Sequence, residues 1–493
     1  MSNLPAGWIN VQLGDVVDYG NTSKAEPTEI AGDSWILELE DIEKKSAKLI
    51  QKVLFSERQS KSTKNKFEKN DVLYGKLRPY LDKVIIANES GYCTTEIIPI
   101  KPGKYLDNRF LFYGLKRKEF IDYVSEVSHG LNMPRLGTKQ GQAAPFVLAP
   151  LNEQIRIADK LDSVLAKVDA AQARLEKIPT LLKRFRQSVL AAATSGELTK
   201  EWREQTLIDN LSESELKSNI ENEWFSSKQR EFIRKNKFPK SLNWRDKVID
   251  PNIEKLEVDT WFSLTLESIA EIIDPNPSHR MPNYVEDGVP FISSENIFGN
   301  DEIDFTVGKK ITNDELKKQK ERYEITNNSF AFTRIGTVGK SVKLALPHNY
   351  GISHAMAVVT PFDNLVNGQF LRLIMSCTST LQQASDGVQS VGVPDLGIGK
   401  MKNFRIPFPP MAEQTEIVRR VESLFTLADT VEKQYLETKK RIDRLTQSLL
   451  AKAFRGELVP QDPNDEPAAE LLKRIQAERN AQPPVKNKRK QQA

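Results

Sequence analysis

The sequence predicts an α+β fold, in which two mixed α/β domains are separated by two long coiled-coil helices in a pseudo-two-fold internal repeat. Three observations predict this fold. The chain repeats itself once, both copies contain a long heptad pattern, and short strand-like segments precede each heptad pattern. A repeat unit of this length is too long for a solenoid, whose units run to about 20–50 residues. The chain is therefore a duplicated half-protein.

The repeat is visible without gaps. Pro150 and Pro410 differ by 260 positions, and the same offset superposes Glu153 on Glu413 and Gly196 on Gly456. Further pairs at this offset are Gln154 and Gln414, Ile157 and Ile417, Ser163 and Ser423, Arg184 and Arg444, and Gln187 and Gln447. A matching register over so many positions is not expected of two unrelated amphipathic helices.

Apolar residues recur at alternating steps of four and three in both copies, which indicates a coiled coil. The first series is Ile157, Leu161, Val164, Val168, Ala171, Leu175, Ile178, Leu182, Phe185 and Val189. The second is Ile417, Val421, Leu424, Ala428, Val431, Tyr435, Thr438, Ile442, Leu445 and Leu449, with one polar position. Some 40 residues of helix predict a rod of roughly 60 Å.

Three residues mark the limits of these helices. Gly196 and Gly456 follow the last heptads, and glycine readily adopts the left-handed conformation that ends a helix. Pro179 lies inside the first pattern, where its missing backbone donor should kink or break the helix.

Short apolar segments before each heptad pattern are also paired. Residues 8–13 resemble residues 261–266, and residues 72–77 resemble residues 330–335. Turn residues separate these segments, as expected for short strands. The predicted order is a first domain (1–149), a first helix (150–198), a charged linker (199–258), a second domain (259–409), a second helix (410–458), and a C-terminal helix with a basic tail (459–493).

Composition agrees with this order. A chain of 493 residues with 39% hydrophobic and 28% charged residues has room for two domains and extended elements. The linker contains Trp202, Trp224 and Trp244, so we expect it to be helical and packed on the long helices. No apolar run approaches a membrane span and no signal pattern opens the chain. With only two cysteines, Cys93 and Cys377, we expect a cytoplasmic protein.

Positive charge is concentrated at matching places in the two copies. Residues 44–83 contain 12 Lys or Arg against 4 Asp or Glu, and residues 309–343 contain 9 against 4. Such stretches are typical of a DNA-backbone contact, although solvated lysine-rich loops have the same composition. The candidate DNA-binding residues follow strand-like segments: Lys76, Arg78, Lys83, Arg334 and Lys340. For each of them a surface salt bridge is the alternative.

No catalytic, metal or cofactor-binding motif is found. Residues 336–341 resemble part of a phosphate-binding loop, but Arg334 stands where its first glycine is required. The four histidines (His129, His279, His348 and His354) and two cysteines show no metal-ligand spacing. A chain this long without such a motif is expected to be a recognition or scaffold protein.

At the helix starts, residues 150–154 read PLNEQ and residues 410–414 read PMAEQ; at the helix ends, residues 184–190 read RFRQSVL and residues 445–458 read LTQSLLAKAFRGEL. With these motifs the whole chain resembles the specificity subunit of a type I restriction-modification enzyme. The resemblance implies two target-recognition domains, each reading one half of a bipartite, asymmetric DNA site, and two antiparallel helices that set the spacing.

The resemblance further implies a subunit without catalysis of its own. It would dock two methylation subunits and, in the full complex, two restriction subunits, which together provide DNA adenine methyltransferase and ATP-dependent endonuclease activities. S-adenosylmethionine, ATP and magnesium are expected on those partners and not on this chain. Two other classes stay open on the residues alone: a stand-alone DNA-processing enzyme, and a coiled-coil scaffold that does not bind DNA.

Overall fold

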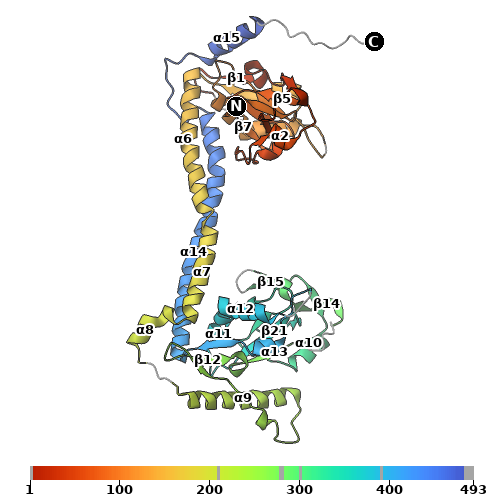
Figure 1. The fold of residues 1–493 in the computed structure, drawn as a ribbon, viewed down its shortest axis with the longest axis vertical. Helices are drawn as coiled ribbons and strands as arrows, with labels where there is room; N and C mark the ends of the chain where they lie inside the picture. The colour runs from red at the N-terminus through yellow and green to blue at the C-terminus, as the bar shows by residue number, and fades with distance from the viewer. Residues whose placement is uncertain are drawn as a thin grey trace. The chain divides into compact units, whose positions relative to one another are not determined.

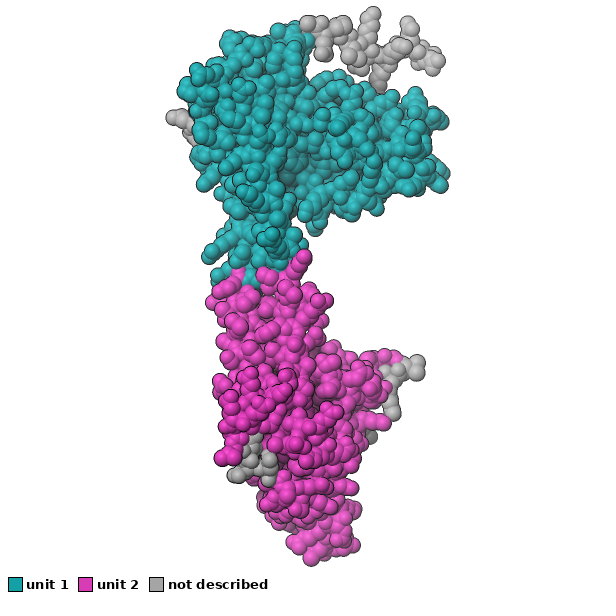
Figure 2. Space-filling model, turned by 60° about the vertical axis from the view of Figure 1, so that its left-hand side comes forward, with its two compact units in different colours: residues 1–176, 435–493 teal, residues 177–434 magenta. Residues whose placement is uncertain are grey.

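A computed structural model describes residues 4–130, 132–207, 211–276, 282–298, 302–388 and 392–481. The chain divides into two compact units (Figure 2): unit 1 consists of residues 1–176 and 435–493, and unit 2 of residues 177–434. Each unit contains one mixed domain, the start of one long helix and the end of the other.

The described residues of the domain of unit 1 form three small sheets, of strand order β2-β5-β8-β3-β4, β7-β6-β9 and β1-β10. β6 and β9 pair antiparallel from Val72 opposite Ile100 to Gly75 opposite Ile97, and both are buried along their whole length. Continuous apolar segments of this kind form strands that are covered on both faces. The strands are β1 Ile9–Gln12, β2 Lys24–Ala25, β3 Trp35–Leu37, β4 Val53–Leu54, β5 Lys64–Phe67, β6 Val72–Gly75, β7 Val84–Ile86, β8 Gly91–Thr94, β9 Ile97–Ile100 and β10 Pro145–Leu148.

Helices connect these strands and cover them. α3 begins after Asp107, whose side chain accepts hydrogen bonds from the backbone N–H groups of Arg109 and Phe110, as an N-cap does. The helices and 3-10 turns of this domain are α1 Leu13–Val16, η1 Pro27–Glu29, η2 Leu39–Asp41, α2 Phe55–Arg58, η3 Pro79–Leu81, α3 Asn108–Leu115, α4 Lys118–Val127 and α5 Thr138–Gln142.

The core of unit 1 joins segments from both ends of the chain. Phe110 of α3 lies 4.6 Å, between ring centroids, from Phe454, which follows the second long helix. Ile157 of the first long helix and Leu471 of α15 (Ala468–Ala481) belong to the same core. The helix predicted in the C-terminal tail is therefore confirmed, and it packs on the first domain. The predicted basic tail lies outside the described residues.

The domain of unit 2 has the same mixed character. Its four-stranded sheet has the order β13-β21-β18-β19, and smaller sheets have the orders β11-β12-β22, β17-β14-β20 and β15-β16. The strands are β11 Glu254–Lys255, β12 Phe262–Thr265, β13 Ala270–Ile273, β14 Tyr284–Ile292, β15 Ile297–Phe298, β16 Glu302–Ile303, β17 Lys309–Ile311, β18 Phe330–Thr333, β19 Ser341–Lys343, β20 Gly351–Ile352, β21 Met356–Pro361 and β22 Arg405–Phe408. Its helices and 3-10 turns are η6 Leu266–Ser268, η7 Ser294–Asn296, α10 Asn313–Lys320, α11 Gly368–Met375, α12 Thr378–Gly387 and α13 Ile398–Lys402.

The charged linker is helical, as predicted. After η4 (Glu197–Thr199), which ends at the first linker residue, it contains α8 Lys200–Gln205, α9 Glu213–Lys235 and η5 Arg245–Lys247. Leu216 and Ile220 of α9 are buried in the core that α7 shares with the second domain, and Trp224 stacks on Trp244. In addition, Arg234 of α9 lies 3.7 Å from Glu271 of β13. The linker thus contacts the second domain as well as a long helix.

The first long helix is broken and the second is continuous. α6 (Leu151–Leu175) ends before α7 (Ile178–Thr194), and Pro179 lies in the first turn of α7, where no backbone donor is needed. α14 (Met411–Ala453) runs for 43 residues, or about 65 Å. The break predicted at Pro179 is confirmed. Gly196 and Gly456, with φ of 77° and 73°, adopt the predicted left-handed conformation.

Within unit 2, α7 and α14 lie side by side and antiparallel (Figure 1). Arg186 of α7 forms ion pairs with Asp429 (2.7 Å) and Glu432 (2.8 Å) of α14. Beyond the end of α7, Leu198 accepts a hydrogen bond from Arg420, so residue numbers rise on one helix as they fall on the other. The antiparallel arrangement that the resemblance implied is confirmed here.

Burial follows the repeat near the domains and weakens away from them. Buried residues recur at the offset of 260 positions: Glu153, Gln154, Ile157, Ala158, Leu161 and Val168 in one copy, and Glu413, Gln414, Ile417, Val418, Val421 and Ala428 in the other. Phe185 and Leu445, which belong to the two heptad series, are 36% and 41% exposed. A pair of helices covers an apolar side chain from one direction only, so side chains far from a domain stay open to water.

Candidate nucleic-acid interface

One strand–turn–strand hairpin in each domain contains the predicted DNA-binding residues. In the first domain, turn A (Lys76–Lys83) joins β6 to β7. The backbone N–H of Gly75 donates to the carbonyl of Lys83 (2.9 Å), and that of Lys76 donates to the carbonyl of Glu96 (2.9 Å). The N–H of Arg78 donates to the carbonyl of Pro134 (2.7 Å). Turn A is therefore fixed at both ends and in the middle.

Turn B (Arg334–Lys340) joins β18 to β19 in the second domain and repeats these contacts. The N–H of Thr333 donates to the carbonyl of Lys340 (2.8 Å), and that of Arg334 donates to the carbonyl of Ala355 (2.9 Å). The N–H of Gly336 donates to the carbonyl of Pro394 (2.9 Å). By these bonds Arg334 is the counterpart of Lys76, Gly336 of Arg78, and Lys340 of Lys83.

Left-handed residues stand near both ends of each turn. In turn A these are Arg78 (φ 50°) and Asp82 (φ 48°); in turn B they are Gly336 (φ 77°) and Gly339 (φ 101°). The glycines that resembled part of a phosphate-binding loop thus serve a hairpin turn. A phosphate-binding loop leads from a strand into a helix, whereas turn B leads from β18 into β19.

A second segment lies against each turn. We name residues 132–136 loop A and residues 392–396 loop B. An antiparallel bridge joins Leu77 of turn A to Arg135 of loop A, and another joins Ile335 of turn B to Asp395 of loop B. Sequence reasoning missed both loops as parts of the site, because only the fold brings them beside the turns.

Three of the predicted residues present side chains that can reach a ligand. Arg78 is exposed on turn A, where its guanidinium makes one long hydrogen bond to the carbonyl of Asn132 (3.3 Å), and Lys76 is partly exposed beside it. Lys340 is exposed on turn B. Within the described part of the chain, the side chains of Lys76 and Lys340 form no hydrogen bond or ion pair.

The side chains of the other two predicted residues, Lys83 and Arg334, bind groups within the protein. Arg334 is only 3% exposed in its side chain and forms ion pairs with Asp274 (2.7 Å) and Asp395 (3.2 Å). Lys83 donates to the backbone carbonyl of Leu39 (2.6 Å), and burial lowers its pKa. For Arg334 the structure favours the alternative, a salt bridge, and places that salt bridge in the interior. Neither side chain is free to meet a phosphate.

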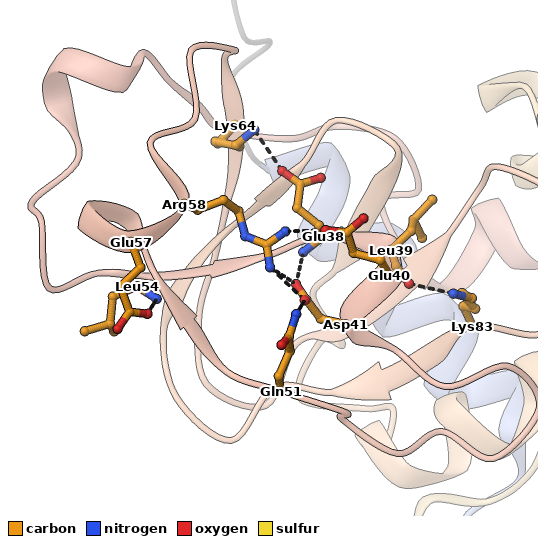
Figure 3. A network of polar contacts seen from close by, with 10 residues as sticks. All are labelled: Glu38, Leu39, Glu40, Asp41, Gln51, Leu54, Glu57, Arg58, Lys64 and Lys83. Atoms are coloured by element: carbon orange, nitrogen blue, oxygen red, sulfur yellow. Dashed lines mark hydrogen bonds and ion pairs between the residues drawn. The ribbon is translucent and has the colours of Figure 1, made fainter. Parts of the chain in front are cut away.

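A network of charged side chains uses further cations of the basic stretch in the first domain (Figure 3). Asp41 is fully buried, and Nη2 of Arg58 contacts both of its carboxylate oxygens, at 2.7 and 2.8 Å. Lys64, 1% exposed, lies 3.0 Å from Glu38. A buried carboxylate needs such partners to offset its lost hydration. These cations stabilise the fold of the segment around η2.

The remaining cations of this stretch are exposed. Lys45 lies close to turn A, because its backbone N–H donates to the carbonyl of Leu81 (3.1 Å). Lys116 fixes both segments, since its ammonium group contacts Asp82 (2.6 Å) and the carbonyl of Lys45 (3.2 Å). The exposed cations of residues 44–83 are Lys44, Lys45, Lys48, Lys52, Lys61, Lys66, Lys69 and Arg78. The structure therefore adds Lys45 to the candidate interface.

Among the described residues, no group of three or more His, Cys, Asp or Glu side chains is placed to hold a metal ion. No helix within the same residues is long and apolar enough to cross a membrane. Turns A and B repeat the same backbone hydrogen bonds, and each carries an exposed cation, Arg78 in turn A and Lys340 in turn B.

Comparisons with known proteins identify the family. The sequence model described as the type I restriction modification DNA specificity domain matches residues 5–180 and 259–439. The chain belongs to this family. It is 31% identical over 409 residues to the type I restriction enzyme EcoBI specificity subunit of Escherichia coli, covering 80% of this chain and 76% of that protein. It is 28% identical over 506 residues to the EcoDI specificity subunit of Escherichia coli, covering 99% of this chain and 98% of that protein.

Solved structures show the same fold. The HsdS subunit from Thermoanaerobacter tengcongensis matches with a TM-score of 0.57 at 18% identity, covering 92% of this chain and 98% of that one. A chain from a structure of type I restriction-modification complex assembly matches with a TM-score of 0.59 at 16% identity, covering 92% and 99%. Because the family model and the curated specificity subunits match most of this chain, it is a DNA specificity subunit of a type I restriction-modification system. It is not an enzyme by itself and works within a complex.

Proposed function

We propose that each domain reads one half of a bipartite, asymmetric DNA site, with turn A and loop A at one half and turn B and loop B at the other. The observation that carries this proposal is the repetition of the same hydrogen-bonded turn, edged by exposed cations, in both copies. Base edges in the major groove carry the sequence information, and phosphate contacts set position and affinity. Two modules of one chain can then read two different half-sites.

Lys76, Arg78 and Lys340 are the side chains that we propose contact DNA, together with Lys45. Lys83 and Arg334 support the turns from within. Domain limits at residues 149, 258 and 409 remain part of this proposal, with the linker of residues 199–258 and the tail of residues 459–493 belonging to neither recognition domain.

The long helices are proposed to set the spacing between half-sites and to dock partner subunits. Large apolar side chains stay exposed on them: Leu181 and Leu427 (each 58%) and Leu436 (51%). Apolar positions along a helix that water still reaches are natural contacts for partner helices.

We propose an assembly with two methylation subunits and, in the full complex, two restriction subunits. S-adenosylmethionine, ATP and magnesium would be bound by those subunits. The complex would act in the cytoplasm, where it meets double-stranded DNA.

The test replaces Lys76, Arg78 and Lys340 by alanine in the complex with methylation subunits. Each lost phosphate contact should reduce the slope of log affinity against log salt by about one, so the triple variant should lose about three, equally for cognate and random DNA. Affinity measured by fluorescence anisotropy across a salt series gives the slope.

The matched control replaces Lys217, Lys237 and Lys240, three exposed lysines of the linker, by alanine. It removes the same charge and should leave the slope as it is. If both triple variants bind DNA with the wild-type slope, turns A and B do not contact the backbone. If both weaken equally, the effect is one of net charge.

A further inference from the structure

Arg334 joins three segments of the second domain that are distant in sequence. Its guanidinium contacts Asp274, which follows β13, and Asp395 of loop B. Its own backbone accepts a hydrogen bond from the N–H of Leu396 (2.8 Å), the residue after Asp395. Loop B is thus attached to turn B by its backbone and by a charged side chain at the same point.

The first domain attaches loop A to turn A with the same backbone bonds and different side chains. The N–H of Leu136 donates to the carbonyl of Lys76 (3.0 Å), as that of Leu396 does to Arg334. Here Arg135, the counterpart of Asp395, forms an ion pair with Glu96 at 3.1 Å. The charge at the loop position is reversed between the copies, yet it is paired in both. Asp395 is paired with Arg334 of turn B, and Arg135 with Glu96, whose carbonyl accepts a hydrogen bond from the backbone of Lys76 in turn A.

We infer that Arg334 is a positioning residue for the second half-site. Through Asp395 and Asp274 it holds loop B against turn B, so that the two segments form one DNA-contacting surface. Arg135 and Glu96 hold loop A in the same way for the first half-site. This inference rests on the proposed function, since it assigns the loops to half-site recognition.

The burial of Arg334 separates this role from direct contact. A guanidinium with a 3% exposed side chain and two carboxylate partners cannot release a counterion from DNA. Its loss should instead free loop B to take several positions. If loop B is no longer fixed to turn B, the DNA-contacting surface discriminates between bases less well, because side chains must be held close to their productive geometry.

The experiment uses the complex with methylation subunits and determines its wild-type site by selection from a random DNA library. Variants Arg334→Met and Asp395→Asn are then measured on the cognate site and on sites with one mismatch in either half. Discrimination against a mismatch is on the order of 10- to 100-fold per base pair in such interfaces. We expect it to fall severalfold in the second half-site, with the first half-site and the salt slope unchanged.

Controls come from the same chain. Asp386→Asn removes an exposed carboxylate of α12 that contacts only Gln382 among the described residues, and it should leave both half-sites as they are. Glu96→Gln should lower the discrimination against mismatches in the first half-site alone. Arg334→Lys, which keeps the charge, should recover part of the lost discrimination.

Several outcomes would overturn the inference. A salt slope lowered by about one in Arg334→Met would make Arg334 a phosphate contact. A lower melting temperature with unchanged discrimination in both Arg334→Met and Asp395→Asn would make it a purely structural residue. If the wild-type complex selects no bipartite site, the proposed function itself fails, independently of these variants.

Discussion

Two buried tryptophan–glutamate pairs join the long helices to the domains. The indole N–H of Trp8 donates to Glu153 Oε2 (2.7 Å), and that of Trp261 donates to Glu413 Oε2 (2.9 Å). Both carboxylates are almost completely buried. Because buried carboxylates must be hydrogen-bonded, each pair fixes the first turn of a long helix to the start of its domain.

The second carboxylate oxygens differ between the copies. Glu413 Oε1 accepts a hydrogen bond from the hydroxyl of Thr199 (2.7 Å) and forms an ion pair with Arg203. Glu153 Oε1 is buried and has no hydrogen-bond partner within the described ranges. Burial raises the pKa of Glu153, although the hydrogen bond from Trp8 and the charge of Arg156 act in the opposite direction.

Glutamine at these two positions should therefore have unequal effects. Glu413→Gln keeps an acceptor for Trp261 but leaves Arg203 without its anion, which should lower the free energy of unfolding by about 2–3 kcal/mol. Glu153→Gln removes a poorly compensated buried charge and should stay within about 1 kcal/mol of wild type. Urea denaturation monitored by tryptophan fluorescence measures both changes, and equal losses would contradict the assignment.

The pH dependence of Glu153→Gln follows from the direction of the pKa shift. Since the pKa of Glu153 is higher in the folded than in the unfolded chain, its ionised form costs stability at neutral pH, and this cost disappears on acidification. The stability of Glu153→Gln relative to wild type should therefore decrease between pH 7 and about pH 4, near the ordinary carboxyl pKa. A relative stability that increases on acidification would mean that the pKa is lowered.

At the residue scale, a local charge pattern in the sequence does not tell an accessible cation from a buried one. Local charge after an apolar segment predicted Lys76, Arg78 and Lys340 as DNA contacts, and the structure leaves their side chains accessible. Arg334 has the same local pattern, but its partner Asp274 lies 60 positions away along the chain. Burial created by partners so distant has no local sequence signal.

At the scale of elements, Pro179 makes the two long helices different: the first is broken next to this residue, and the second is continuous. Its counterpart at the offset of 260 positions is Lys439, in the middle of the continuous α14. Lys439→Pro should remove a backbone hydrogen bond and lower the free energy of unfolding by about 3 kcal/mol. Pro179→Ala should change it by less than about 1 kcal/mol, because the helix already begins there.

Circular dichroism and thermal unfolding measure both variants, with Lys439→Ala as the control for the lost side chain. Lys439→Ala should stay within about 0.5 kcal/mol of wild type, as exposed surface substitutions do. A Lys439→Pro variant as stable as this control would show that α14 tolerates a break at the same place as the first long helix.

Elements with strong local patterns were predictable from the sequence. The apolar segments at residues 72–75 and 330–333 are strands, and the heptad patterns are helices that end before Gly196 and Gly456. Loops A and B were not predictable as parts of the candidate site. Their position beside the turns depends on bridges between residues distant in sequence, such as Leu77 and Arg135, which are 58 positions apart. Packing between distant segments, and not local propensity, decides which loop meets which turn.

At the scale of the whole molecule, duplication lets one chain present two recognition modules whose details have diverged. Turns A and B keep their backbone bonds, while the ion pairs that attach loops A and B have opposite charge at Arg135 and Asp395. The backbone scaffold is thus common to both copies and the side chains are free to vary. This division is what reading two different half-sites requires.

If the long helices set the spacing, their length should determine the gap between half-sites. We expect that inserting one heptad after Ala171 of α6 and another after Val431 of α14 keeps the apolar seam in register. Each helix lengthens by roughly 10 Å at about 1.5 Å per residue. At about 3.4 Å per base pair, the non-specific gap should grow by about three base pairs, with both half-sites unaltered.

Three additional base pairs also rotate one half-site relative to the other by roughly 100°, since a turn of DNA takes about 10 base pairs. Binding should therefore weaken even where the gap changes as expected. Insertions of four residues are the control, because they break the heptad register and should abolish stable folding or subunit docking. Sequencing methylated sites in a host that expresses the variant with its partner subunits measures the gap directly. Methylation at the original gap would mean that the linker or the partner subunits, and not the helices, determine the distance.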